Sequence, residues 1–124
     1  MTPIALVVDD SMLIRHTVCR YFERRGFGVE SATNGAEALE LLKNFRPDII
    51  ITDLKMPKMD GHQFIKELKS GPQTSSIPIV VLAGRKGGND CMDGTRADYI
   101  IFKDIDIESQ LQQVLKTAFN SSQG

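Results

Sequence analysis

The sequence is poor in features that mark several large classes of protein. It has two cysteines and no tryptophan among 124 residues. The cysteines, Cys19 and Cys91, fit neither a disulfide framework nor a CxxC redox or metal motif. No apolar run approaches the roughly 18 residues that cross a bilayer, and no basic segment with a cleavage site opens the chain. We therefore expect a cytoplasmic protein whose cysteines are reduced.

An excess of charge of one sign is also missing. The sequence has 15 Lys and Arg against 16 Asp and Glu, which gives a net charge of −1 and does not indicate a nucleic-acid binder. One expected helix carries a group of arginines: Arg15, Arg20, Arg24 and Arg25. A solvated helix face is a commoner reason for such a group than contact with phosphates. From the length we expect one domain over residues 1–120, a flexible tail over 121–124 and no separate effector domain.

Apolar runs alternate with segments of helical spacing along the chain. The apolar runs predict five strands, at residues 4–8, 27–32, 48–52, 77–82 and 99–102. The helical spacing predicts helices at about 12–25, 36–43, 62–69 and 107–118. Strands that alternate with helices through short loops indicate an α/β fold, a doubly wound five-stranded parallel sheet with helices on both faces.

Charged residues follow three of the five apolar runs. Asp9 and Asp10 come after the first run, Asp53 after the third and Lys103 after the last. Since ligands of open α/β sheets bind outside the carboxyl ends of the strands, we expect these side chains to share one ligand site. Converging carboxylates repel each other unless some are protonated or a cation neutralises them. Mg²⁺ suits such a site because it is usually held by one or two carboxylates with waters and phosphate oxygens.

This edge predicts metal-dependent phosphoryl transfer. An aspartate can form an acyl phosphate, which makes Asp53 the candidate nucleophile, and Lys103 would supply a second cation. Each residue has a plainer interpretation when taken alone. Asp10 or Ser11 could simply cap the next helix, and a lone lysine is usually solvated. The coincidence of all these residues at one edge favours the phosphoryl-transfer interpretation.

The motifs around these residues resemble those of two-component response-regulator receiver domains. The similarity runs from about residue 4 to residue 119 and is most specific in PDIIITDLKMPKMDG, residues 47–61. Shorter matching pieces are VDDS at 8–11, NGAEAL at 34–39, IP at 77–78 and AD at 97–98, together with Arg15 and Lys103. The resemblance implies a CheY-like, flavodoxin-like sheet with strand order 2-1-3-4-5.

The resemblance also assigns roles to the residues at the sheet edge. It implies that Asp53 is the phosphoacceptor and that Lys103 binds the phosphoryl group. It implies that Mg²⁺ is held by Asp10, Asp53 and the backbone carbonyl of Lys55, with Asp9 acting largely through water. The partners it implies are a sensor histidine kinase or histidine phosphotransfer protein and a downstream protein target, with no nucleic acid and no membrane.

The chain departs from the receiver pattern at the positions that report phosphorylation. Ala83 stands where the family has a Thr or Ser hydroxyl that bonds the phosphoryl group, although the amide of Gly84 could still donate to it. Ile100 replaces the aromatic switch residue, and Tyr99 should project to the opposite side of the strand. Asp104 replaces the proline that follows the conserved lysine, so no X-Pro cis bond can form there.

Three hypotheses follow from these residues. The first is a phosphoacceptor receiver that signals through protein–protein interaction and is not an enzyme for external substrates. The second is a pseudo-receiver, an interaction module whose output does not depend on phosphorylation. The third is a phosphohydrolase of the haloacid-dehalogenase type, which the sequence disfavours because Lys55 stands where that Asp-x-Asp motif has its second acid.

Overall fold

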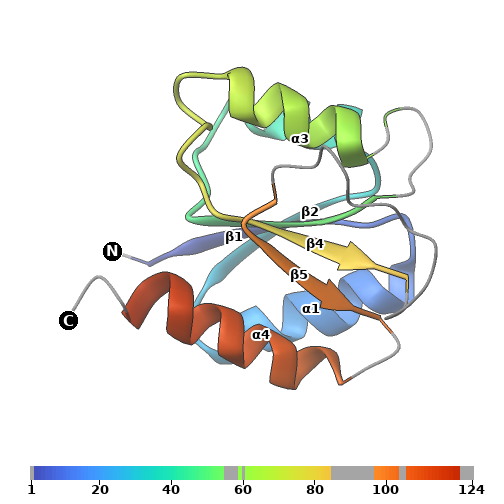
Figure 1. Ribbon diagram of the computed structural model, residues 1–124, viewed down its shortest axis with the longest axis vertical. Coiled ribbons are helices and arrows are strands. Elements are labelled where there is room, and N and C mark those ends of the chain that lie inside the picture. Colours follow the sequence, from blue (N-terminus) through green and yellow to red (C-terminus); the bar gives the residue numbers. More distant parts are fainter. Residues whose placement is uncertain (1, 55–58, 60, 85–96, 104–105, 121–124) are drawn as a thin grey trace.

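The computed structural model describes residues 2–54, 59, 61–84, 97–103 and 106–120 (Figure 1). It contains one five-stranded sheet in which every pair of neighbouring strands is parallel, in the order β2-β1-β3-β4-β5. The strands are β1 (Ile4–Val8), β2 (Gly28–Ala32), β3 (Ile49–Asp53), β4 (Ile79–Ala83) and β5 (Tyr99–Phe102). The helices are α1 (Met12–Arg24), α2 (Gly35–Leu41), α3 (Gly61–Ser70) and α4 (Ile107–Leu115), and a π-helical turn, η1 (Lys116–Asn120), follows α4. The predicted fold class and strand order are confirmed.

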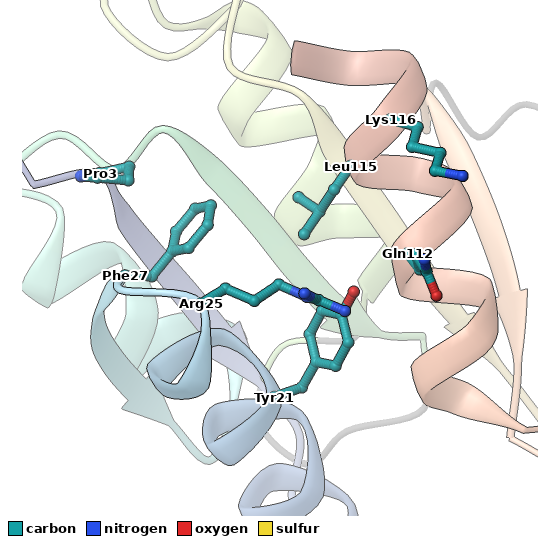
Figure 2. Close-up of a pocket in the computed structure, with 7 residues that line it drawn as sticks. All are labelled: Pro3, Tyr21, Arg25, Phe27, Gln112, Leu115 and Lys116. Carbon is teal, nitrogen blue, oxygen red and sulfur yellow. The ribbon is translucent and has the colours of Figure 1, made fainter. Parts of the chain in front are cut away.

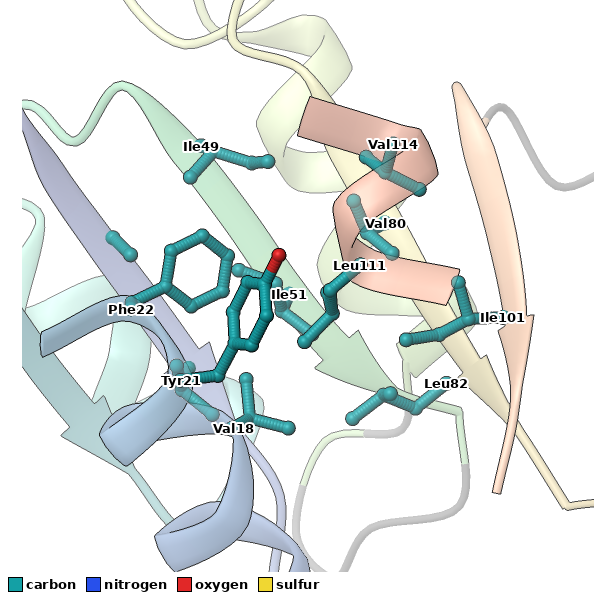
Figure 3. Close-up of a cluster of buried hydrophobic side chains, with 12 residues drawn as sticks. Val18, Tyr21, Phe22, Ile49, Ile51, Val80, Leu82, Ile101, Leu111 and Val114 are labelled. Carbon is teal, nitrogen blue, oxygen red and sulfur yellow. The ribbon is translucent and has the colours of Figure 1, made fainter. Parts of the chain in front are cut away.

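Side chains that alternate along the strands build two hydrophobic clusters, one on each face of the sheet. The cluster under α1 and α4 contains Val7, Ile51, Leu82 and Ile101 from the sheet and Phe22 and Leu111 from the helices (Figure 3). The cluster on the other face contains Leu6, Ile50 and Val81 from the sheet, Ala38 from α2 and Phe64 from α3. Figure 1 shows α1 and α4 on one side of the sheet and α3 on the other. The inner strands are covered on both faces, which is why they read as nearly continuous apolar runs.

A predicted strand boundary differs from the observed one where the apolar run in the sequence is longer than the hydrogen-bonded strand. The fourth strand begins at Ile79 rather than at residue 77, because the amide of Ile77 donates to Thr74 O in the preceding turn. Ile77 is nevertheless buried, so its apolar character reflects packing and not strand pairing. Gly26 follows α1 with a φ of 87°, a conformation that favours glycine and that ends the helix close to the predicted residue.

Several residues that the sequence analysis discussed lie outside the described residues: Lys55, Cys91, Asp104 and the tail 121–124. Within the described part of the chain, no helix is both long enough and apolar enough to span a membrane.

Candidate functional site

The carboxyl ends of the strands bring Lys103 against two of the predicted aspartates. Its Nζ lies 3.1 Å from Oδ2 of Asp9 and 3.0 Å from Oδ2 of Asp53. Asp9 follows β1, Asp53 ends β3 and Lys103 follows β5, so the lysine side chain crosses the end of β4 to reach them. The residue at that end is Ala83, whose carbonyl oxygen accepts a hydrogen bond of 2.9 Å from the Lys103 amide.

Asp9 is held in place by its neighbours and is fully buried. Its Oδ1 accepts from the Ser11 amide at 2.8 Å, and its backbone carbonyl accepts from Nη1 of Arg15 at 2.8 Å. Its Oδ2 makes the ion pair with Lys103 but has no hydrogen-bond partner in good geometry. Burial and, to a smaller degree, the charge of Asp53 raise the pKa of Asp9, while the Ser11 amide and Lys103 oppose them. A charged Asp9 is therefore costly and would gain from a further cation.

Asp53 is held on both of its carboxylate oxygens. Oδ1 accepts from the Leu54 amide at 2.7 Å, and Oδ2 faces Lys103. The hydroxyl of Thr52 donates to the carbonyl of Asp53 at 2.9 Å. The carboxylate is thus oriented by its own strand end and by the lysine that follows the last strand, and the Asp53 side chain is only 9% exposed.

Lys103 stays protonated because of these carboxylates. Burial alone would lower the pKa of Lys103, but its hydrogen bond to Asp53 and the charges of Asp53 and Asp9 outweigh burial and raise it. A side-chain clamp that no sequence motif indicated holds the backbone next to the lysine. The side-chain amide of Gln110 on α4 both donates to Phe102 O and accepts from Phe102 N, each at 2.8 Å, and so fixes the residue before Lys103.

The acidic residues fit a hard divalent cation. Carboxylate oxygens of Asp9, Asp10 and Asp53 all lie within 4.8 Å of one another. Asp10 is exposed, and Ser11 rather than Asp10 caps α1, since its Oγ accepts from the Ile14 amide at 3.4 Å. One lysine cannot balance the charge of these carboxylates, and Asp9 Oδ2 has no hydrogen-bond donor. An all-oxygen set with excess negative charge is the kind of site that Mg²⁺ occupies.

Ala83 and Ile100, which depart from the receiver pattern, lie in different surroundings. Ala83 ends β4 and is 3% exposed, and its side chain is a methyl group without a hydroxyl. Gly84 is exposed directly after it. On β5, Tyr99 packs against the cluster under α1 and α4 together with Ile101, whereas Ile100 is 41% exposed. The predicted opposite orientation of Tyr99 and Ile100 is therefore confirmed.

The comparison with protein families agrees with this geometry. The response regulator receiver domain family matches residues 5–116. The chain belongs to this family. Over 98 residues, this receiver domain is 37% identical to the response regulator MprA of Mycobacterium sp. strain KMS, in an alignment that covers 77% of this chain and 42% of MprA. The chain therefore spans less than half the length of that relative.

Solved structures show the same fold along the whole receiver domain. The chemotaxis response regulator CheY4 of Vibrio cholerae has a TM-score of 0.86 and 30% identity, with 96% of this chain and 100% of that chain covered. The receiver domain of the sensor histidine kinase PA1611 of Pseudomonas aeruginosa PAO1 has a TM-score of 0.81 and 18% identity, with 97% and 99% covered. That protein has a magnesium ion coordinated in its active site cleft.

Proposed function

We propose that this receiver domain accepts a phosphoryl group on Asp53 in two-component signalling. The donor would be the phosphohistidine of a sensor histidine kinase or of a histidine phosphotransfer protein, and the output would be a protein–protein interaction in the cytoplasm. The observation that supports this most is the buried Asp53 carboxylate, fixed between Lys103 Nζ and the Leu54 amide beside two further acids. Neither nucleic acid nor a membrane is part of the proposal.

The geometry supports an in-line transfer. A carboxylate oxygen of Asp53 attacks phosphorus, the P–O bond forms as the P–N bond breaks, and the imidazole leaves and takes up a proton. Lys103 stands 3.0 Å from the carboxylate and is positioned to neutralise charge on the phosphoryl oxygens. Mg²⁺, held by Asp10, Asp53 and the carbonyl of Lys55 with Asp9 acting through water, would neutralise the remaining charge.

The test is phosphorylation by a small donor. Incubation with acetyl phosphate and Mg²⁺, followed by intact mass measurement, should add one phosphoryl group to the native protein and none to Asp53→Asn. Asp48→Asn is the matched control, because Asp48 stands at the opposite end of the same strand, where its carboxylate accepts from the Ile4 amide at 2.8 Å. An adduct on Asp53→Asn, or none on folded native protein, would contradict the proposal.

The methyl group of Ala83 favours a second candidate, the pseudo-receiver. Without a hydroxyl at the end of β4, this strand cannot donate a side-chain hydrogen bond to the phosphoryl group. Beryllofluoride with Mg²⁺, a phosphoryl mimic, separates the two candidates by amide NMR shifts. Shifts that reach β5 and α4 indicate a switch, whereas shifts confined to the neighbours of Asp53 indicate a pseudo-receiver. Once a partner is known, a tenfold change in its affinity on adding the mimic, about 1.4 kcal/mol of coupling, would exclude the pseudo-receiver.

We further propose that the domain promotes only its own phosphorylation and dephosphorylation. The alternative, an Mg²⁺-dependent phosphohydrolase, would need a second acid two residues after Asp53, where Lys55 stands. Incubation with p-nitrophenyl phosphate and Mg²⁺ should therefore give no sustained release of nitrophenolate. Steady turnover that Asp53→Asn abolishes would instead establish the phosphohydrolase.

A further inference from the structure

A pocket of about 440 Å³ lies at the end of the sheet opposite the acidic cluster (Figure 2). It opens between the end of α1, the residues that precede β1 and β2, and the end of α4. Its lining residues are Pro3, Tyr21, Arg25, Phe27, Gln112, Leu115 and Lys116. The volume falls within the range of pockets that bind small molecules, and the proposed phosphoryl chemistry uses none of these residues.

The walls of the pocket are apolar and partly aromatic. Pro3, Phe27 and Leu115 are half-buried, and the ring of Tyr21 belongs to the core. Figure 2 shows the Phe27 ring and the Leu115 side chain on either side of the opening above Tyr21. Flat aromatic groups pack favourably against such rings and aliphatic side chains. The walls therefore suit a ligand with a flat apolar body.

The rim of the pocket is positively charged. Arg25 and Lys116 are exposed, and the lining residues that the structure describes include no acid. The Arg25 guanidinium carbon lies 4.3 Å from the centre of the Tyr21 ring, which holds its planar group over the pocket. The acid on α4 pairs elsewhere, since Glu108 lies 3.8 Å from Arg24. The planar guanidinium of Arg25 is suited to bind a carboxylate, and Lys116 adds positive charge to the rim.

The Tyr21 hydroxyl is an unused donor in this pocket. Tyr21 is 4% exposed, and its hydroxyl makes no hydrogen bond within the described residues. Figure 2 shows the hydroxyl directed toward the side of the pocket where Leu115 and Gln112 lie. Buried hydroxyls without a partner are rare because losing water without a replacement is unfavourable. Within the described residues, the other buried side-chain oxygen without a hydrogen bond is Asp9 Oδ2, which instead forms the ion pair with Lys103 in the acidic cluster.

We propose that this pocket binds a small aryl carboxylate. The aryl group lies against Phe27 and Leu115, and the carboxylate lies against Arg25, where it accepts a hydrogen bond from the Tyr21 hydroxyl, while Lys116 adds positive charge at the rim. Hydrophobic contact, charge and the missing hydrogen bond then all point to one chemical class of ligand. Such a ligand would join the end of α1 to the end of α4, and this proposal does not rest on the proposed phosphorylation of Asp53.

The probe for this site is 2-naphthoate, with the neutral 2-naphthamide as its matched control. A ligand of about a dozen non-hydrogen atoms should bind with a dissociation constant of about 1 mM or tighter at ordinary ligand efficiency. Titration followed by amide NMR should shift Arg25, Phe27 and Leu115 in a saturable way. The amide compound should bind at least about tenfold more weakly, since it lacks the charge that the two cations attract.

Three variants assign the binding to this pocket. Arg25→Gln and Tyr21→Phe should each weaken 2-naphthoate binding by about tenfold, the loss of a charged or charge-assisted hydrogen bond. Tyr21→Phe should leave the ligand-free protein at least as stable as the native one, because the hydroxyl that it removes has no partner. Arg20→Gln is the control, because Arg20 is an exposed arginine on α1 that does not line the pocket. The proposal is wrong if 2-naphthoate shows no saturable binding, or if it binds Arg25→Gln as tightly as the native protein.

Discussion

Replacing Lys103 by methionine tests the electrostatics of the acidic site most directly. Methionine keeps most of the length and the apolar stem of lysine but removes the ammonium group that faces Asp9 and Asp53. Those carboxylates are almost fully buried, and the lysine side chain is only 20% exposed. The substitution therefore leaves two neighbouring anions without the cation that balances them. We expect Lys103→Met to be folded but clearly less stable than the native protein when no metal is present.

The expected loss of stability follows from the short distance between Lys103 and Asp53. At an effective dielectric constant of about 20, a pair of unit charges 3.0 Å apart attracts by about 5.5 kcal/mol before desolvation is counted. Removing one partner of a buried pair commonly costs about 3–5 kcal/mol. Asp9 can relieve part of this loss by taking up a proton, because its pKa is already raised. We therefore expect the free energy of unfolding at neutral pH to fall by about 3 kcal/mol, the lower end of that range.

Urea unfolding followed by circular dichroism, with EDTA and then with Mg²⁺, measures this loss. Mg²⁺ should restore most of the stability of Lys103→Met, because it supplies the missing positive charge to the same carboxylates. Lys69→Met is the matched control. Lys69 Nζ lies 3.3 Å from Asp98, but the Asp98 side chain is 42% exposed. Lys69→Met should therefore lose about 1 kcal/mol of stability or less, and this loss should not respond to Mg²⁺. Equal losses in the two variants, or a Lys103→Met loss that Mg²⁺ leaves unchanged, would refute the reasoning.

Three further predictions concern the site and the fold. Ala83→Ser should tighten the binding of beryllofluoride with Mg²⁺ by about tenfold, because the new hydroxyl can donate to the mimic; calorimetry that shows equal affinity would contradict this. In EDTA, the raised pKa of Asp9 means that the folded state loses stability relative to the unfolded state as the pH rises above 3.8. Urea unfolding across this pH range should therefore show that the free energy of unfolding of Asp9→Asn increases relative to that of the native protein as the pH rises. A difference between the two that stays constant with pH would argue against a buried, charged Asp9. Gly26→Ala should cost about 1 kcal/mol in thermal unfolding because its φ is 87°, and Gly26→Asn should cost less.

Local patterns in the sequence were enough to predict the α/β fold class. The apolar runs that became β1, β3 and β4 are continuous because both faces of an inner parallel strand are covered, and that signal needs no knowledge of contacts. The strand order came from the resemblance of the motifs to receiver domains. The beginning of β4 was predicted two residues early, because the buried side chain of Ile77 has the same apolar character in a turn as in a strand.

The sequence by itself also determined which residues meet at the acidic edge. Asp9, Asp53 and Lys103 each follow an apolar run, and the carboxyl ends of parallel strands share one edge whatever the details of packing. The tertiary structure alone decided how they meet. Lys103 lies between two carboxylates, and the Gln110 side chain from α4 holds the backbone of the preceding residue, Phe102.

The pocket at the other end of the sheet also depended on tertiary structure. Tyr21 and Leu115 are far apart in the sequence, and they line one pocket only because α1 and α4 pack on the same face of the sheet. The Tyr21 hydroxyl without a hydrogen-bond partner has no sequence signature, since whether a buried oxygen finds a donor is decided by every element packed around it. Charged residues that follow apolar runs can be located in the sequence, whereas the hydrogen bonds of buried polar atoms depend on the packed structure.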